Sequence, residues 1–170
     1  MNFVELLYGT KYQLDKNEQK IITNMSDEIC NQGRLHFVNK YQRDKSLQLH
    51  QMNLNGFGAE LAFCKLCNIS FDSTTVEKES HFTKVDAILR NGKTVDVKNT
   101  VYSSGKLIVR TGKEQKIVDI YALMIGVFPN FIFSGWATYN EIIQTKLIKD
   151  LGWGDAYTLN QSQLNHSLMV

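Results

Sequence analysis

The sequence predicts an α/β fold in which helices flank a mixed central β-sheet. Two features support this: early segments repeat apolar residues at helical spacing, and later segments are short, apolar and rich in β-branched or aromatic residues. A chain of 170 residues can bury one ordinary core but is short for two. We therefore expect one domain over residues 1–170, with a helical N-terminal extension over 1–50 and the main core over 53–150.

Three of the expected helices have recognisable sequence signals. In the stretch 17–41 apolar residues recur at helical spacing, and Gly33 should divide it into two helices. In the stretch 53–68 an asparagine can cap the first turn, and small residues allow close packing. Thr138 and Glu141 have the spacing of a capping box, which should open an amphipathic helix. The expected helices cover 17–41 in two parts, 53–68, 112–118 and 139–151.

The strands are expected mainly in the middle of the chain. Asn91-Gly92 separates two segments with strand character and is a strong hairpin signal. The run over 117–128 is apolar without alternation, as expected of a strand buried on both faces. The expected strands are 69–76, 83–90, 93–101, 107–110, 117–128 and 131–138, while 152–170 carries no clear pattern.

Composition limits the class of protein without deciding its function. Hydrophobic residues make up 43% and charged residues 21%, which is typical of globular chains. No apolar run is long enough for a bilayer, and the N-terminus lacks a secretory signal, so we expect a cytoplasmic protein that does not insert into membranes. The three cysteines, an odd number, fit a reducing compartment. A net charge of +2 means that a nucleic-acid partner would need a local basic patch.

The expected hairpin carries charges at informative positions. Side chains alternate along a strand, so Asp96 and Lys98 share one face while their apolar neighbours share the other. If the apolar residues of both strands face one core, Asp86 must lie on the face of Asp96 and Lys98. A strict two-residue loop would instead place Asp86 opposite Val97. The pattern therefore predicts an odd-length loop or a bulge, with Gly92 in the left-handed conformation.

Two carboxylates on one partly buried face repel each other and need a partner. A divalent cation resolves this, and oxygen ligands suit Mg²⁺ or Mn²⁺. Beside it, Lys98 can hold or help to deprotonate an attacking water, or stabilise a phosphate. Glu60 offers a third carboxylate, because it protrudes from the apolar stripe of the helix expected over 53–68.

These residues resemble the motif of the PD-(D/E)xK nuclease superfamily, which has the restriction-endonuclease-like fold. There, a helix with a glutamate precedes a strand with an aspartate, and the neighbouring strand carries an acidic residue, any residue and a lysine. The matching positions are Glu60 in NGFGAELAF, Asp86 in KVDAI, and Asp96 with Lys98 in VDVKN. Val85 stands where the motif has proline. The resemblance covers about residues 53–150 and makes that stretch the expected catalytic core.

The resemblance implies a nuclease with a restriction-endonuclease-like core. Asp86, Asp96 and the backbone carbonyl of Val97 would bind Mg²⁺, with Mn²⁺ as a substitute. Glu60 would complete the metal site, and Lys98 would serve the nucleophile. DNA is expected as the substrate rather than RNA, because it is the commoner substrate in the superfamily. Cleavage of both strands would require two sites and hence a homodimer.

Basic residues after the lysine-bearing strand are candidate contacts to the substrate. Arg110, Lys113 and Lys116 follow that strand and can contact phosphates that flank the cleaved bond. A solvated loop is the alternative for the same residues.

Other interpretations of the charged residues stay open. The runner-up function is a nucleic-acid-binding or assembly module with a nuclease-like fold and no turnover. A third interpretation is a charged strand face that simply meets solvent, which is common on antiparallel sheets.

The cysteine pair has two interpretations as well. Cys64 and Cys67 have the spacing of a metal knuckle, which could bind zinc with a histidine. Buried core thiols are favoured, because the pair lies within a helix and only Cys30 remains as another thiolate.

Overall fold

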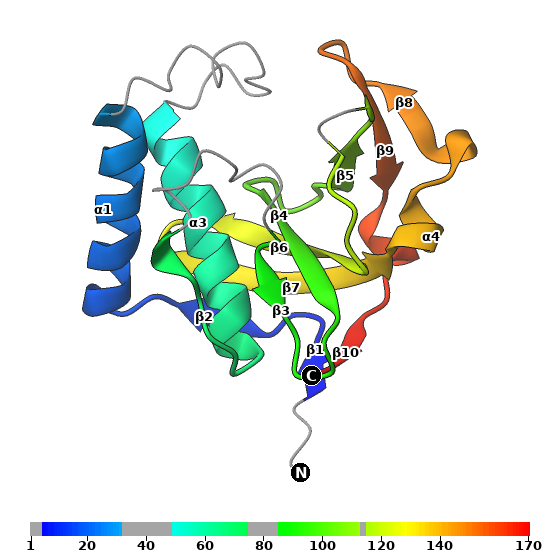
Figure 1. Ribbon diagram of the computed structural model, residues 1–170. Helices are drawn as coiled ribbons and strands as arrows, with labels where there is room; N and C mark the ends of the chain where they lie inside the picture. The colour runs from blue at the N-terminus through cyan, green and yellow to red at the C-terminus, as the bar shows by residue number, and fades with distance from the viewer. Residues whose placement is uncertain (1–4, 32–48, 75–84, 113–114) are drawn as a thin grey trace.

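The fold is α/β, as the sequence predicts, and is built around a mixed β-sheet (Figure 1). The computed structural model describes residues 5–31, 49–74, 85–112 and 115–170. The helices are α1 (Lys16–Asn31), α3 (Leu49–Leu66) and α4 (Tyr139–Ile142), with 3-10 turns at Thr145–Leu147 and Gln161–Gln163. The strands are β1 (Glu5–Leu7), β2 (Lys11–Gln13), β3 (Ala87–Ile88), β4 (Thr94–Thr100), β5 (Leu107–Arg110), β6 (Ile120–Val127), β7 (Asn130–Thr138), β8 (Ile148–Asp150), β9 (Asp155–Leu159) and β10 (Ser167–Met169).

The central sheet has the strand order β2-β7-β6-β4-β3. β4 and β6 run parallel, and every other pair in this sheet is antiparallel. A parallel pair needs a crossover connection. Here residues 101–119 make that crossover, and they include β5.

β6 is buried on both faces, in agreement with its uninterrupted apolar sequence. Ile120, Ala122 and Met124 pack in the core that includes α1 and α3. Tyr121 and Leu123 point the other way, into a second core with β5, β9 and α4. The sheet is therefore a layer between two helices on one face and a small sheet on the other (Figure 1).

The small sheet has the order β5-β9-β8, and a separate ribbon pairs β1 with β10. The segment 107–110 is a strand with the expected bounds, but it belongs to the small sheet rather than the central one. The pattern along 107–110 alone does not show which sheet it joins, because its partner β9 lies in the stretch without a clear pattern.

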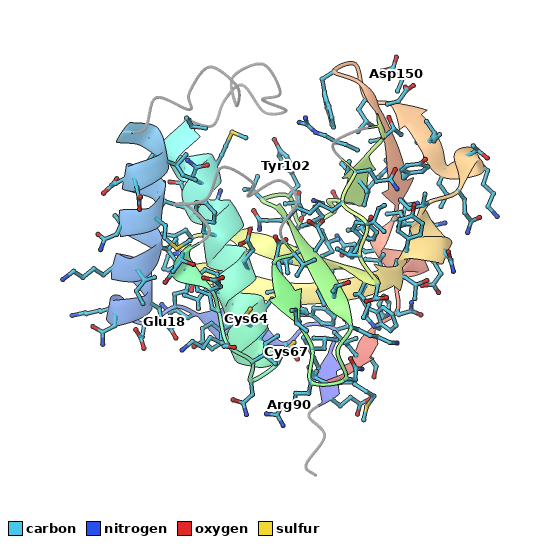
Figure 2. The ribbon with its side chains drawn as sticks, in the orientation of Figure 1. Glu18, Cys64, Cys67, Arg90, Tyr102 and Asp150 are labelled. Carbon is cyan, nitrogen blue, oxygen red and sulfur yellow. The ribbon has the colours of Figure 1, made fainter. Side chains whose placement is uncertain are left out.

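α3 packs close to the central sheet because it presents small residues to it. A Cβ atom at Gly58 would lie 2.8 Å from Cζ of Phe131 in β7, so any other residue there would force the Phe131 ring to shift. Cys64 near the end of α3 and Cys67 just after it are both fully buried (Figure 2). None of the described helices combines the length and apolarity needed to cross a membrane.

The hairpin between β3 and β4 has the predicted odd-length loop. Ala87 pairs with Val95, and the Leu89 N–H donates to the Lys93 carbonyl at 2.9 Å, which leaves three residues in the turn. Gly92 has a φ of 83°, the left-handed conformation that a three-residue loop places at glycine. This register puts Asp86 and Asp96 on one face.

The N-terminal extension is not wholly helical. β1 and β2 precede α1, and β2 is an edge strand of the central sheet. Its strand conformation comes from pairing with β7, which a local pattern in three residues cannot signal. The second helix expected after Gly33 lies outside the described residues.

The strand expected over 69–76 is wrong for its described part. Residues 69–72 have no regular structure, and a short 3-10 turn follows. Asp72 Oδ1 accepts hydrogen bonds from Thr74 N at 2.9 Å and Thr74 Oγ1 at 2.6 Å. Such a local side-chain bond competes with a strand ladder.

The helix expected over 139–151 is much shorter, although its capping box is confirmed. Gln144 Nε2 donates to the carbonyls of Asn140 and Glu141 at 3.0 Å each, which satisfies the end of α4. β8 then pairs with β9. The helix expected over 112–118 is also wrong for residues 115–118, which are irregular.

Candidate active site

Five charged side chains lie near one another where β3 begins beside the middle of β4, and we call them the charged cluster: Glu60, Asp86, Asp96, Lys98 and Lys116. Asp86 directly precedes β3, and Asp96 and Lys98 lie on β4. Glu60 comes from α3, and Lys116 comes from the connection between β5 and β6. Segments far apart in the sequence therefore form the cluster.

Ion pairs join the two aspartates through one ammonium group. Lys116 Nζ lies 2.7 Å from Asp86 Oδ1 and 3.0 Å from Asp96 Oδ1. Lys98 Nζ lies 2.5 Å from Asp96 Oδ2. Both carboxylates thus face the same small space, which already holds positive charge.

The hairpin geometry fixes the position of Asp86. Its Oδ2 accepts a hydrogen bond from the backbone N–H of Val97 at 2.8 Å, in place of a further ladder bond between β3 and β4. The N–H and C=O of a strand residue point toward the same neighbouring strand. The carbonyl of Val97 therefore lies at the β3 edge of β4, the edge at which Asp86 is held.

Burial and charge shift the carboxyl pKa values in opposite directions. Asp96 is 0% exposed, and its burial alone would raise its pKa. Lys98 and Lys116 outweigh burial, so the pKa of Asp96 is lowered and its charged form is favoured. For Asp86, burial and then the charge of Asp96 outweigh the lysines, and its pKa is raised.

Glu60 is partly buried and makes none of these ion pairs. Burial, followed by repulsion from Asp86, raises the pKa of Glu60 well above its usual value. The charges of Asp86, Lys116 and Asp96 all act on Glu60, so its carboxyl group lies near the cluster. Because burial and this repulsion favour the neutral form, the carboxyl group of Glu60 readily takes up a proton.

Lys116 occupies a place that sequence reasoning did not assign to it. Its side chain is 18% exposed, because it lies among the carboxylates rather than on a solvated loop. Burial works against its charge, but Asp86 and Asp96 outweigh burial and raise its pKa. A charge count could have found it, since three carboxylates near a single lysine require a second cation.

Of the other expected phosphate contacts, Arg110 is not part of the cluster. Arg110 lies on β5, with its guanidinium carbon 5.0 Å from the centre of the Trp153 ring. Lys113 lies outside the described residues. A role of these two residues in binding a substrate stays a prediction.

A divalent metal fits this donor set, although the set is not arranged as a finished metal site. In the described ranges, no three His, Cys, Asp or Glu side chains are close enough together to hold a metal ion as they stand. Both oxygens of Asp96 are buried, and each faces a lysine ammonium group, Lys98 at 2.5 Å and Lys116 at 3.0 Å. Buried carboxylate oxygens that face cations suit a hard ion such as Mg²⁺ or Mn²⁺.

The cysteine pair lies in the core. Burial raises the pKa of Cys64 and of Cys67 to about 12, so both thiols are protonated when no metal is present. The interpretation as buried core thiols is confirmed by their burial.

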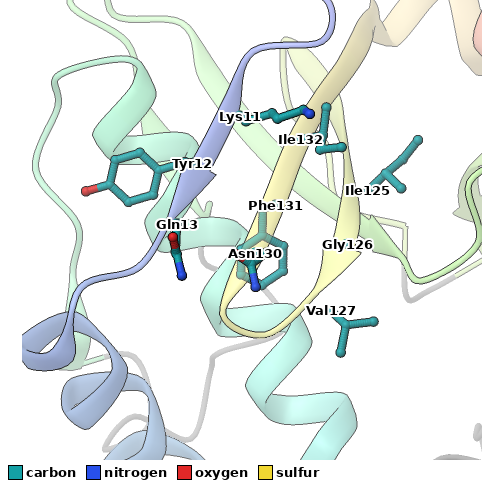
Figure 3. Close-up of a pocket in the computed structure, with 9 residues that line it drawn as sticks. All are labelled: Lys11, Tyr12, Gln13, Ile125, Gly126, Val127, Asn130, Phe131 and Ile132. Carbon is teal, nitrogen blue, oxygen red and sulfur yellow. The ribbon is translucent and has the colours of Figure 1, made fainter.

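A hollow of about 700 Å³ lies away from the charged cluster, between β2 and the hairpin of β6 and β7 (Figure 3). Strand register places its residues Lys11, Ile125 and Ile132 in one row with Thr100, two positions beyond Lys98. The hollow is therefore on the sheet face that carries Asp96 and Lys98. It contributes no member of the cluster.

The fold and the cluster together define a mixed α/β protein with a buried carboxylate and lysine centre at the edge of its sheet. Residues 4–132 match the model of a family of unknown function (DUF5843), and the chain belongs to that family. This match includes all five residues of the charged cluster. Neither the curated proteins nor the solved structures contain a match to the chain.

Proposed function

We propose that the protein is a metal-dependent nuclease of the PD-(D/E)xK type, with DNA as its substrate. The observation that carries the proposal is the convergence of Asp86 and Asp96 on one cation, 2.7 Å and 3.0 Å away. A solvated strand face would not hold an aspartate at 0% exposure between two lysines. The helix, strand and strand order of Glu60, Asp86 and Asp96 also agrees with the motif.

Mg²⁺ is the proposed cofactor, and Asp86, Asp96 and the carbonyl of Val97 would hold it. When bound, Mg²⁺ supplies a Lewis acid for the phosphate and a coordinated water of lowered pKa. Asp86 can keep its bond to the Val97 N–H while its other oxygen, Oδ1, turns to the ion. Glu60 could bind it through water.

Lys98 is the side chain best placed to act on the reacting groups. Its side chain is 35% exposed, so its ammonium can reach a phosphate on the solvent side while its stem stays against β4. There it can hold an attacking water in line or balance the charge that develops on phosphate oxygens. Asp96 orients this ammonium through the ion pair.

The proposal is tested with supercoiled plasmid, linear duplex, single-stranded DNA and RNA, each with Mg²⁺, Mn²⁺ or EDTA. We expect cleavage of DNA only with a divalent ion, and a loss of at least about 100-fold in rate in Asp96→Asn and Lys98→Met. Asp150→Asn and Lys149→Met are matched controls on exposed positions of β8, and they should keep the wild-type rate. Circular dichroism checks that each variant is folded.

The same experiment separates the alternative functions. Anisotropy of labelled DNA that reports binding with no product under any condition would identify a binding or assembly module instead of an enzyme. Absence of both binding and product would leave the charged cluster with a structural role only. Cleavage that persists at full rate in Asp96→Asn would contradict the site itself.

A further inference from the structure

Both the backbone carbonyl and the side-chain ammonium group of Lys116 are held by neighbouring residues. The Tyr121 hydroxyl donates a hydrogen bond to the Lys116 carbonyl, and the Tyr121 side chain is 0% exposed. The ammonium is fixed by Asp86 and Asp96. This backbone anchor makes the position of Lys116 a feature of the fold rather than one pose of a surface side chain.

The two lysines of the cluster differ in what they contact. Among the residues that the structure describes, Lys98 pairs with Asp96 alone and is 35% exposed, whereas Lys116 bridges both aspartates and is 18% exposed. The ammonium of Lys116 therefore lies where a cation shared by the two carboxylates would lie. Lys98 lies at the side of that position.

A metal ion and the Lys116 ammonium cannot share this place. Both would need contact with Asp86 Oδ1 and Asp96 Oδ1, and like charges at such short range repel strongly in a buried site. The lysine side chain has a flexible four-carbon stem, so its ammonium can leave while its backbone stays fixed.

We infer that Lys116 is a tethered counter-cation, which closes the two-aspartate site without metal and must be displaced for a divalent ion to bind. This inference rests on the proposed function, because it concerns the same metal site. Lys116 thereby lowers the affinity of the site for metal, and it keeps the two carboxylates compatible with the folded state when no metal is present. It acts as a positioning residue of the metal site.

Metal affinity gives the first test, by calorimetric titration of the folded protein with Mn²⁺. We expect Lys116→Met to bind Mn²⁺ at least about tenfold more tightly than wild type, a difference of about 1.4 kcal/mol. Lys98→Met should show a smaller gain, because Lys98 contacts one carboxylate, and Lys149→Met should show none. Equal or weaker binding by Lys116→Met would overturn the inference.

A second test uses the wild-type protein, in case Lys116→Met does not fold. Brief acetylation followed by mass spectrometry measures the reactivity of each lysine amine with EDTA or with Mn²⁺. We expect Lys116 to be protected in EDTA and to react at least about tenfold faster with saturating Mn²⁺, since its ammonium leaves the buried ion pairs. Lys65, which pairs with Glu18 on α1, should not change. Unchanged protection of Lys116 at saturating Mn²⁺ would refute displacement.

Failure of the inference is distinguishable from failure of the proposed function. If wild type binds Mn²⁺ and cleaves DNA but Lys116 stays protected, the function stands and the counter-cation role falls. If neither wild type nor Lys116→Met binds Mn²⁺ at the highest Mn²⁺ concentration of the titration, both the metal site and the displacement are wrong.

Discussion

Replacement of Asp96 by asparagine tests whether the cluster is held by charge. The substitution keeps the shape of the side chain but removes the anion that contacts Lys98 at 2.5 Å and Lys116 at 3.0 Å. Loss of one partner of a buried ion pair costs about 3–5 kcal/mol when the other charge stays uncompensated. Lys116 keeps Asp86, and Lys98 is 35% exposed and can turn to water, so we expect the lower end, about 3 kcal/mol.

The loss can be measured by urea denaturation in EDTA, and it should also lower the melting temperature by about 6–12 °C for a chain of this size. The pKa of Asp96 is lowered in the folded protein. The ionised Asp96 therefore contributes fully to the free energy of unfolding above the pKa of an unfolded aspartate, about 3.9. This contribution is lost as the pH falls from that value through the lower pKa of the folded state. The stability difference between wild type and Asp96→Asn should accordingly shrink by about pH 3.

Asp119→Asn is the matched control for this measurement. Asp119 is exposed at the same end of the sheet, where its Oδ2 accepts hydrogen bonds from Thr94 N and Oγ1 at 2.8 Å each. Asparagine can accept the same bonds, so little stability should be lost. An Asp96→Asn protein as stable as wild type near neutral pH, or a loss that does not depend on pH, would contradict an ionised and paired Asp96.

Three further predictions concern the scaffold around the site. Glu18→Ala should lower the free energy of unfolding by about 2–3 kcal/mol, measured by thermal unfolding, because the buried Glu18 carboxylate in the first turn of α1 accepts bonds from three donors and no acceptor would replace it. A loss no larger than that of an alanine substitution at an exposed position would contradict this. Gly92→Ala should lower the free energy of unfolding by about 1 kcal/mol through the φ of 83° alone, since a Cβ there meets no atom within 4 Å. Asparagine tolerates the left-handed conformation better than alanine, so a Gly92→Asn variant that loses as much stability would argue against this cause. Cys64 and Cys67 should resist alkylation near pH 8 until denaturant is added, because burial raises their pKa values to about 12, whereas the partly exposed Cys30 should react first; rapid labelling of all three thiols in the folded protein would refute the packing of α3.

Local patterns predicted the elements whose signals lie in their own residues. The face of Asp86 followed from alternation and from the glycine turn, because a shift of one residue would have exposed the apolar side chains of both strands. The capping box of α4 was recognisable too, because it depends only on Thr138 and Glu141, which are three residues apart. The length of that helix was not predictable, because the pairing of β8 with β9 depends on residues that its own sequence does not contain.

The candidate site was predictable only as far as the hairpin and the helix before it. Lys116 is separated from Asp96 by a strand of another sheet, so nothing in its local sequence indicated that it returns to the cluster. A helix was expected over 112–118. The chain is instead irregular at 115–118, and burial of the carboxylates determines where the ammonium goes.

The pairing of β5 with β9 has a practical consequence for anyone who wishes to shorten this protein. A fragment that ends at residue 132, where the family match ends, would contain every member of the charged cluster yet lack β9. In such a fragment β5 would have no β9 to pair with, so the connection from β5 to β6 would no longer be held in place. Lys116 lies in that connection and would lose its fixed position beside the aspartates. Such a fragment should retain all the charged groups while losing their arrangement.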